Sequence, residues 1–110
     1  MEILFDDKRL EKWANDYRLC QKKMGSIRAK IFNSRLDDLR SAETLEDARN
    51  LPGRYHELKE PRKGQWACDL DQPYRLIFTP HLSPIPTDNS GRYIWLEIKS
   101  VEIIEIADYH

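Results

Sequence analysis

Features that mark exported, membrane-bound or disulfide-stabilised proteins are scarce in this sequence. No apolar run comes near the roughly eighteen residues that a membrane-spanning helix needs. Residues 1–7 lack the basic start and the longer apolar stretch of an export signal. The two cysteines, Cys20 and Cys68, do not form a C-x-x-C motif, which favours buried apolar fillers over a disulfide or a redox pair. We therefore expect a cytoplasmic protein with reduced thiols and no membrane contact.

Internal repeats and low-complexity tracts are also missing from the 110 residues. A chain of this length buries too little surface to support two independent cores. Charged residues make up 34% of the chain and apolar residues 40%, a balance that suits a small interior beneath a charged surface. We expect one globular domain over residues 1–110.

Positive and negative charges nearly cancel overall but are unevenly spread along the chain. The net charge is −1, yet residues 8–63 contain 15 lysines and arginines against 9 acidic residues. A polyanionic partner would need such a local excess. For any single basic residue, however, the better interpretation is a solvated helix face.

Two amphipathic helices are expected near the amino terminus. After a short apolar strand at 2–5, an aspartate can cap a helix that begins near Lys8 and ends at Gly25. Ser26 can cap a second helix, so that the pair forms an antiparallel hairpin. Spacings of three and four residues predict one buried face on each helix, made of Leu10, Trp13, Tyr17, Cys20 and Met24 and then of Ile27, Ile31, Phe32, Leu36 and Leu39.

The second half of the chain has the pattern of short strands. Residues 41–50 form a polar connector with one helical turn, and β-rich segments then follow one another as in an antiparallel meander. Three prolines predict a long loop at 80–92, and β-branched residues predict a central strand near the end. The expected strands are 55–59, 65–70, 74–79, 95–98 and 101–106. The fold class is therefore α+β, with an N-terminal strand and a two-helix hairpin packed on a small, mainly antiparallel, twisted sheet.

Three successive proton-transfer groups close the sequence: the carboxylic acid of Asp108, the phenol of Tyr109 and the imidazole of His110. His56 supplies a second imidazole in a basic segment. An acid, a base and a cation are enough to cleave RNA next to its 2′-hydroxyl without a metal. One alternative is a frayed and inert chain end. Metal binding by the two histidines and Asp108 is disfavoured, because their spacing matches no ligand signature.

The order of these elements and a series of short motifs resemble HigB-like toxins of the RelE superfamily, which are also called plasmid maintenance killer proteins. The likeness covers nearly the whole chain and implies a RelE-like fold. The motifs are Leu51-Pro52-Gly53, His56-Glu57-Leu58-Lys59, Arg62-Lys63-Gly64-Gln65-Trp66, Pro73-Tyr74-Arg75-Leu76-Ile77-Phe78 and Asp108-Tyr109-His110.

The resemblance also implies an activity and its partners. Members of this group are toxins of type II toxin-antitoxin systems. They cut messenger RNA in the A site of the ribosome's 30S subunit, without a metal or another cofactor. A cognate helix-turn-helix antitoxin of the HigA type silences each toxin. Operator DNA would be reached only through that antitoxin.

Carried over by residue, the resemblance implies a catalytic group of His56, Asp108, Tyr109 and His110. Lys59, Arg62, Lys63 and Arg75 are the candidates that hold RNA phosphates. Either histidine could be the base and the other the acid. Asp108 could fix an imidazole tautomer or act as the base, and Tyr109 could stack on an exposed base.

Two other functions compete with the nuclease. The chain could be a non-catalytic scaffold that binds an antitoxin-like repressor and helps it to regulate its own operon. A metal-dependent hydrolase is a weaker third possibility. The residues themselves specify neither a codon preference, nor an oligomeric state, nor a purpose for the 80–92 loop.

Overall fold

The computed structural model describes residues 1–108, so the predicted site residues Tyr109 and His110 lie outside the described part of the chain. It has an α+β fold, as expected. The elements in chain order are β1 (Glu2–Phe5), α1 (Lys8–Ala14), α2 (Tyr17–Met24), α3 (Ser26–Ser41), the 3-10 turn η1 (Glu46–Asn50), β2 (His56–Glu57), β3 (Trp66–Asp69), β4 (Tyr74–Pro80), the 3-10 turn η2 (Trp95–Glu97) and β5 (Ser100–Asp108).

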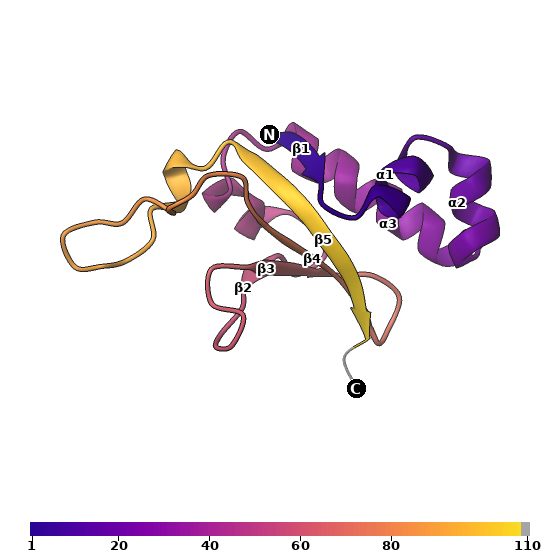
Figure 1. The fold of residues 1–110 in the computed structure, drawn as a ribbon. Coiled ribbons are helices and arrows are strands. Elements are labelled where there is room, and N and C mark those ends of the chain that lie inside the picture. Colours follow the sequence, from indigo (N-terminus) through magenta and orange to yellow (C-terminus); the bar gives the residue numbers. More distant parts are fainter. Residues whose placement is uncertain (109–110) are drawn as a thin grey trace.

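The five strands form one sheet in the order β1-β5-β4-β3-β2, which is traced in Figure 1. β1 runs parallel to β5, and every other neighbouring pair is antiparallel. The long β5 lies between β1 and β4, so the central strand predicted from its β-branched residues is confirmed. β1 accompanies only its first half, because Phe5, the last residue of β1, pairs with Ile103.

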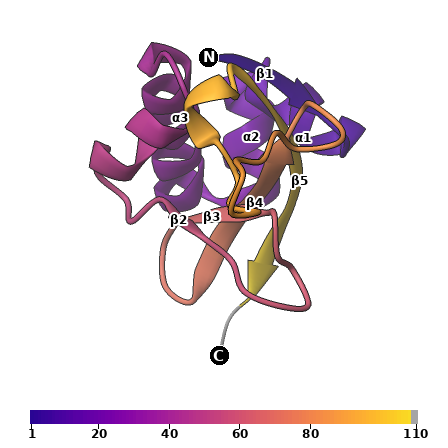
Figure 2. The same cartoon turned by 90° about the vertical axis from the view of Figure 1, so that its left-hand side faces the viewer.

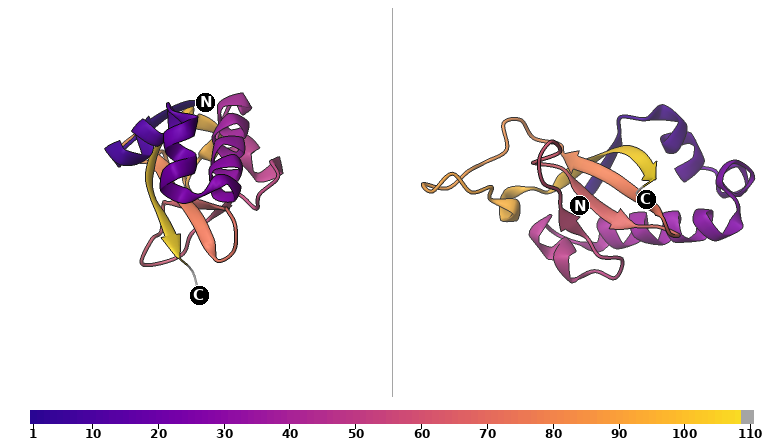
Figure 3. Two further views of the ribbon diagram at one scale, coloured as in Figure 1. Left: turned by 90° about the vertical axis from the view of Figure 1, so that its right-hand side faces the viewer. Right: turned by 90° about the horizontal axis from the view of Figure 1, so that it is seen from below.

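All three helices lie on one side of the sheet, as the turned views in Figure 2 and Figure 3 show. The hydrophobic core fills the space between these two layers. The largest of its fully buried side chains are Trp66, Phe32, Phe78, Leu36 and Leu39. Both cysteines are buried and free, which confirms their prediction as apolar fillers. Burial raises the pKa of the Cys68 thiol to about 12.

The first expected helix is broken into two. Asn15 ends α1, and the Asp16 side chain accepts a hydrogen bond from the Leu19 amide at 3.1 Å to begin α2. The Asp16 side chain caps the free backbone amides at the start of α2, and this favours a new helix over continuation of α1. The spacing of apolar residues does not reveal such a competition. The chain direction changes there, and Tyr17, expected in the core, is 46% exposed.

The buried face of α3 also differs from the expectation. Ile27 is 72% exposed, whereas Ala29, Phe32, Leu36 and Leu39 are buried. At 100° per residue, Ile27 lies on the side of the helix opposite to Ala29 and Leu36. Ser26 does not cap this helix; Gly25 is the N-cap residue, with a φ of 85° that an L-residue rarely adopts.

The region around the long loop contains a further correction. Residues 95–97 form η2 instead of the expected strand. η2 carries Trp95 into contact with Trp66, with the rings edge-to-face and their centroids 5.5 Å apart. Within residues 1–108, no helix has the length and apolar character that crossing a membrane requires.

Two substitutions on one helix test the revised face of α3. Leu36→Ala should lower the free energy of unfolding by about 2–5 kcal/mol, because it leaves a cavity in the core. Ile27→Ala should change it by less than about 0.5 kcal/mol, because that side chain is solvated. Urea denaturation followed by circular dichroism measures both. Equal costs would contradict the assigned face.

Candidate functional site

The face of the sheet that the helices leave uncovered carries the predicted histidine. Residues directly opposite each other on antiparallel strands share a face. His56 on β2 lies opposite Ala67, which lies opposite Ile77, which in turn lies opposite Glu105 on β5. We call this side the open face, because the core residues Trp66, Cys68, Leu76 and Phe78 occupy the other side of the same strands.

A strained turn leads into β2. Gly53 has a φ of 111° and Arg54 a φ of 55°, so both residues have a positive φ, in the left-handed region of backbone conformation. The amide of Asp69 donates to the Gly53 carbonyl at 2.8 Å and holds this turn against the sheet. A Cβ on residue 53 would lie 2.4 Å from the Nε of Arg35, so a larger residue would have to displace that side chain and would also strain the backbone at this φ.

The turn also fixes the state of the His56 ring. Its Nδ1 lies 2.6 Å from the carbonyl oxygen of Arg54, which can only accept a hydrogen bond. Nδ1 therefore carries the proton, and Nε2 of the neutral ring is the basic nitrogen. A partly exposed imidazole with its tautomer set in this way can take up a proton from a substrate hydroxyl.

Beside His56, the open face holds a carboxylate between two guanidinium groups. Asp69 lies 3.5 Å from the Nε of Arg54 and 3.5 Å from the Nε of Arg75, measured to different oxygens. Its side chain is mostly buried, whereas that of Arg54 is 68% exposed. The three groups together carry one excess positive charge, which suits the binding of a phosphate.

Arg62 reaches across the open face from the β2–β3 loop. Its Nη2 donates to the Glu105 carboxylate at 3.1 Å, and its Nη1 donates to Gln65 at 2.9 Å. Ala67 and Ile77 lie in the row between His56 and Glu105 and are fully buried, although no helix covers this face. Arg62 is therefore held by an acidic partner instead of standing ready for a phosphate.

The two predicted lysines lie on the same β2–β3 loop. The Lys59 side chain is exposed and has no ion-paired or hydrogen-bonded partner within residues 1–108. The Lys63 ammonium lies 5.7 Å from the centre of the Tyr93 ring, which is a cation–π contact. Both cations can therefore still receive an anion.

Asp108, the last described residue, lies in a different environment. It is the cross-strand partner of Tyr74 and therefore belongs to the helix-covered face of the sheet. There the Arg28 guanidinium stacks 3.6 Å from the centre of the Tyr74 ring and forms a bidentate ion pair with Asp71. A neighbouring hollow of about 280 Å³ is lined by Arg9, Trp13, Lys23, Arg28, Tyr74 and Glu105, among others.

The structure thus gathers only part of the predicted site. His56 and Arg75 share the open face, and Arg62 crosses it. Asp108 is not beside His56, because β3 and β4 lie between their strands, a separation of about 14 Å at ordinary strand spacing. Within residues 1–108, no three histidine, cysteine, aspartate or glutamate side chains gather as metal ligands would.

Two residues of the open face were not predicted. Arg54 precedes His56 by two positions, and its role depends on a left-handed backbone that sequence patterns do not reveal. Asp69 did leave a signal, since an acidic residue inside the apolar strand Trp-Ala-Cys-Asp should be buried only with a cationic partner. That reasoning would have pointed to Arg75, which is opposite Asp69 on β4.

Comparison with known proteins identifies a distant structural neighbour. No family model matches the sequence, and no curated protein matches it. A solved structure described as a YoeB/ParE toxin from Agrobacterium tumefaciens aligns with a TM-score of 0.48 and 17% sequence identity. The alignment covers 100% of each chain. A likeness of this degree does not assign the chain to a family or give it an activity.

Gly53→Ala should disturb the turn that positions Arg54 and His56. The new Cβ would meet the Arg35 side chain and would also strain the φ of 111°. Gly91→Ala is the matched control, since its φ is also positive, at 79°, but no atom lies within 4 Å of the added Cβ. We expect about 2–3 kcal/mol of destabilisation at residue 53 and about 1 kcal/mol at residue 91. Thermal unfolding of both variants tests this order, and equal shifts would contradict it.

Asp71→Asn should remove an ion pair whose contribution depends on pH. Arg28 lowers the pKa of the Asp71 carboxyl below its ordinary value of 3.8. The pair therefore stabilises the fold above that ordinary value, and the contribution is lost as the pH falls through the lowered pKa of the folded state. Urea titrations near neutral pH should show a loss of about 1 kcal/mol.

The loss caused by Asp71→Asn should shrink and then vanish as the pH falls through the lowered pKa of the folded-state carboxyl, because the parent carboxyl is then protonated. Asp37→Asn is the control, because it breaks an exposed ion pair with Arg40 and should cost little at any pH. A cost at Asp71 that is constant over the whole pH range would exclude the ion pair as its source.

Proposed function

We propose that the protein is the toxin of a type II toxin-antitoxin system and cleaves messenger RNA in the ribosomal A site without a metal. The observation that carries this proposal is the state of His56. Its Nδ1 is bound to the Arg54 carbonyl, and its ring shares the open face with the Arg54–Asp69–Arg75 group. A fixed base beside two guanidinium groups provides the base and the cations, two of the three elements that metal-free cleavage at a 2′-hydroxyl requires. The sequence resemblance to HigB-like toxins supports the same reaction.

In the proposed reaction, Nε2 of His56 accepts the proton of the 2′-hydroxyl. The 2′-oxygen then attacks the adjacent phosphorus, and the bond to the 5′-oxygen breaks as that oxygen receives a proton. Arg75 and Arg54 balance the charge that develops on the phosphate oxygens. Asp69 keeps both guanidinium groups in place. With His56 as the base, the other histidine of the group implied by the resemblance, His110, is the proposed acid for the leaving oxygen, with Asp108 and Tyr109 beside it in the sequence.

The remaining predicted cations serve the flanking RNA. Lys59 and Lys63 project from the β2–β3 loop and would contact phosphates next to the scissile one. Arg62 keeps this loop against the open face through Glu105, so its role is to position the loop. The proposed partners are therefore the 30S subunit with its messenger RNA and a helix-turn-helix antitoxin of the HigA type. Operator DNA is reached only through that antitoxin.

One observation favours a second function. His56 and Asp108 belong to opposite faces of the sheet, and two strands lie between the strands that carry them. A chain that had kept the scaffold only to bind an antitoxin-like repressor would have no need to bring them together. Such a protein would bind its partner tightly but leave growth and transcripts unchanged.

Inducible expression separates the two functions. The parent should arrest growth, and brief induction should produce transcript ends inside translated codons. His56→Gln should reduce cutting at least about 100-fold, because general base catalysis is lost. The matched control is His81→Gln, an exposed histidine of the long loop, which should remain as toxic as the parent.

Circular dichroism of the purified His56→Gln and His81→Gln variants should match that of the parent, so that loss of fold is not mistaken for loss of chemistry. Cutting by programmed ribosomes should persist in chelator concentrations that leave the ribosomes intact. Full toxicity of His56→Gln would refute the role of the imidazole. A harmless parent that still binds its antitoxin would establish the scaffold function instead.

A further inference from the structure

A second charged hollow lies at the edge of the sheet, away from the open face. It measures about 450 Å³ and lies between η1, the edge strand β2 and the end of the long loop. Its lining includes Arg49, Glu57, Lys63, Arg92, Tyr93 and Trp95. A neighbouring hollow of about 420 Å³ shares Glu57, Lys63 and Tyr93 and extends to Leu58, Lys59 and Glu60. Together they form one groove around the free edge of β2, which we call the edge groove.

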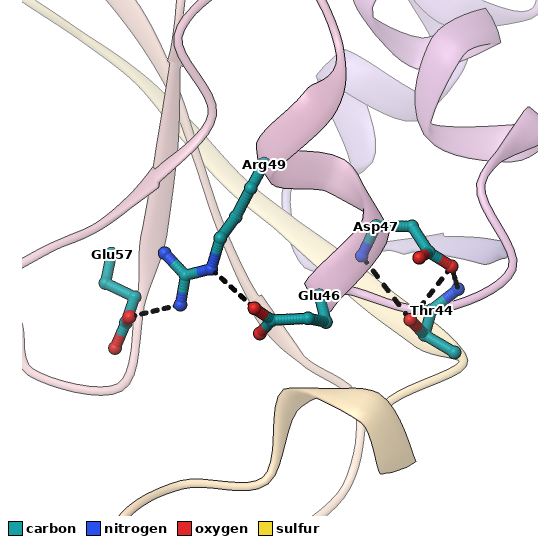
Figure 4. Close-up of polar contacts among 5 residues, drawn as sticks. All are labelled: Thr44, Glu46, Asp47, Arg49 and Glu57. Carbon is teal, nitrogen blue, oxygen red and sulfur yellow. Dashed lines mark hydrogen bonds and ion pairs between the residues drawn. The ribbon is translucent and has the colours of Figure 1, made fainter.

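Polar contacts fix one wall of the edge groove. Figure 4 shows the Arg49 guanidinium held between two carboxylates, one from η1 and one from β2. Its Nε donates to Glu46 at 3.0 Å and its Nη2 to Glu57 at 2.5 Å. The same guanidinium lies 4.7 Å from the centre of the Trp66 ring. The two glutamates are therefore already neutralised in part before any ligand arrives.

The opposite wall offers an aromatic ring and two cations. The partly exposed Tyr93 ring tilts against Trp95, with the centroids 5.1 Å apart, and Lys63 lies over it. Neither Lys63 nor Arg92 has an ion-paired carboxylate within residues 1–108. The lining of the larger hollow has three cations and two carboxylates, so its net charge is positive.

The two loops that form this wall are packed together. Gly64 is buried, and a Cβ there would lie 3.2 Å from Cδ1 of Ile85 and 3.8 Å from the Tyr93 hydroxyl. The long loop therefore touches the β2–β3 loop and presents Tyr93 at a defined place. An aromatic platform of this kind, flanked by cations without carboxylate partners, is the arrangement that binds single-stranded nucleic acid.

We propose that the edge groove binds a nucleotide of single-stranded RNA next to the cleavage site. Its base takes the place of the Lys63 ammonium on the Tyr93 ring, and its phosphate lies between Lys63 and Arg92. The proposal rests on the proposed function, because it extends the path of the same substrate. His56 and Glu57 are successive residues of the edge strand and face opposite sides, the open face and the edge groove. An RNA strand that passes His56 reaches the groove by turning round this edge at Leu58 and Lys59.

The test measures binding instead of cutting. In a His56→Gln background, a fluorescent single-stranded RNA is titrated with protein at low salt and its anisotropy is recorded. Tyr93→Leu should weaken binding about tenfold, because base stacking is lost, whereas Tyr93→Phe should bind as tightly as the protein that keeps Tyr93. Tyr17→Leu is the matched control, since that tyrosine is exposed on α2 and lines neither hollow of the edge groove. RNA with abasic sites should bind equally to the protein that keeps Tyr93 and to the Tyr93→Leu variant.

The cations have a separate readout that does not depend on how well the Tyr93 variants fold. Lys63→Gln and Arg92→Gln should each reduce the slope of log affinity against log salt by about 0.7, the value for one phosphate contact with a single strand. Lys30→Gln, an exposed lysine of α3, should leave the slope unchanged.

Failure of this inference can be told apart from failure of the proposed function. If Tyr93→Leu binds RNA as tightly as Tyr17→Leu, or if salt slopes do not change, the edge groove is not an RNA site, even if the parent remains toxic. The inference is also overturned if the His56→Gln protein does not bind RNA at all. Binding of an acidic peptide, instead of RNA, at Tyr93 would overturn it as well. Binding that depends on Tyr93 in a parent that cuts nothing would uphold the groove and refute the nuclease.

Discussion

The contact on which the candidate site depends is the burial of one carboxylate between two guanidinium groups. A charge as enclosed as that of Asp69 is tolerated only with partners, and Arg54 and Arg75 supply them from two different segments. The same residue uses its backbone as well. Its amide holds the Gly53 turn, and its carbonyl accepts a hydrogen bond from Arg35 of α3 at 2.7 Å. The turn, the helix and the open face are therefore connected through a single residue.

The two faces of the sheet differ in composition and role because the helices cover only one of them. On the covered side, apolar residues of β3, β4 and β5 meet α3 and provide the stability. On the open face, small or branched residues in the middle are flanked by charged groups at the rim. Since the stability comes from the covered side, charges on the open face can be arranged for binding without disturbing the core.

Much of this architecture could be predicted because it follows from local patterns. The β-branched run near the end indicated the central strand, and the stop at Gly25 followed from the need for a left-handed residue. The break at Asp16 could not be predicted, because aspartate occurs both on solvated helix faces and at helix starts.

For the site, the alternation of side chains along β4 placed Arg75 on the other face of the strand from Tyr74 and Leu76. Alternation could not say which of the two faces the helices would cover. The separation of His56 from Asp108 depends on strand order and on a bulge at Ile77/Phe78, both of which are set by long-range pairing.

The glycine at residue 64 has a consequence for how this surface can change over evolutionary time. Because the long loop rests directly on the backbone there, neither loop can be lengthened or rebuilt alone without losing that contact. The two loops form a single exchangeable unit that lies outside the main core. A related chain could acquire a different ligand preference by replacing both loops together, while the helices and the rest of the sheet stayed the same.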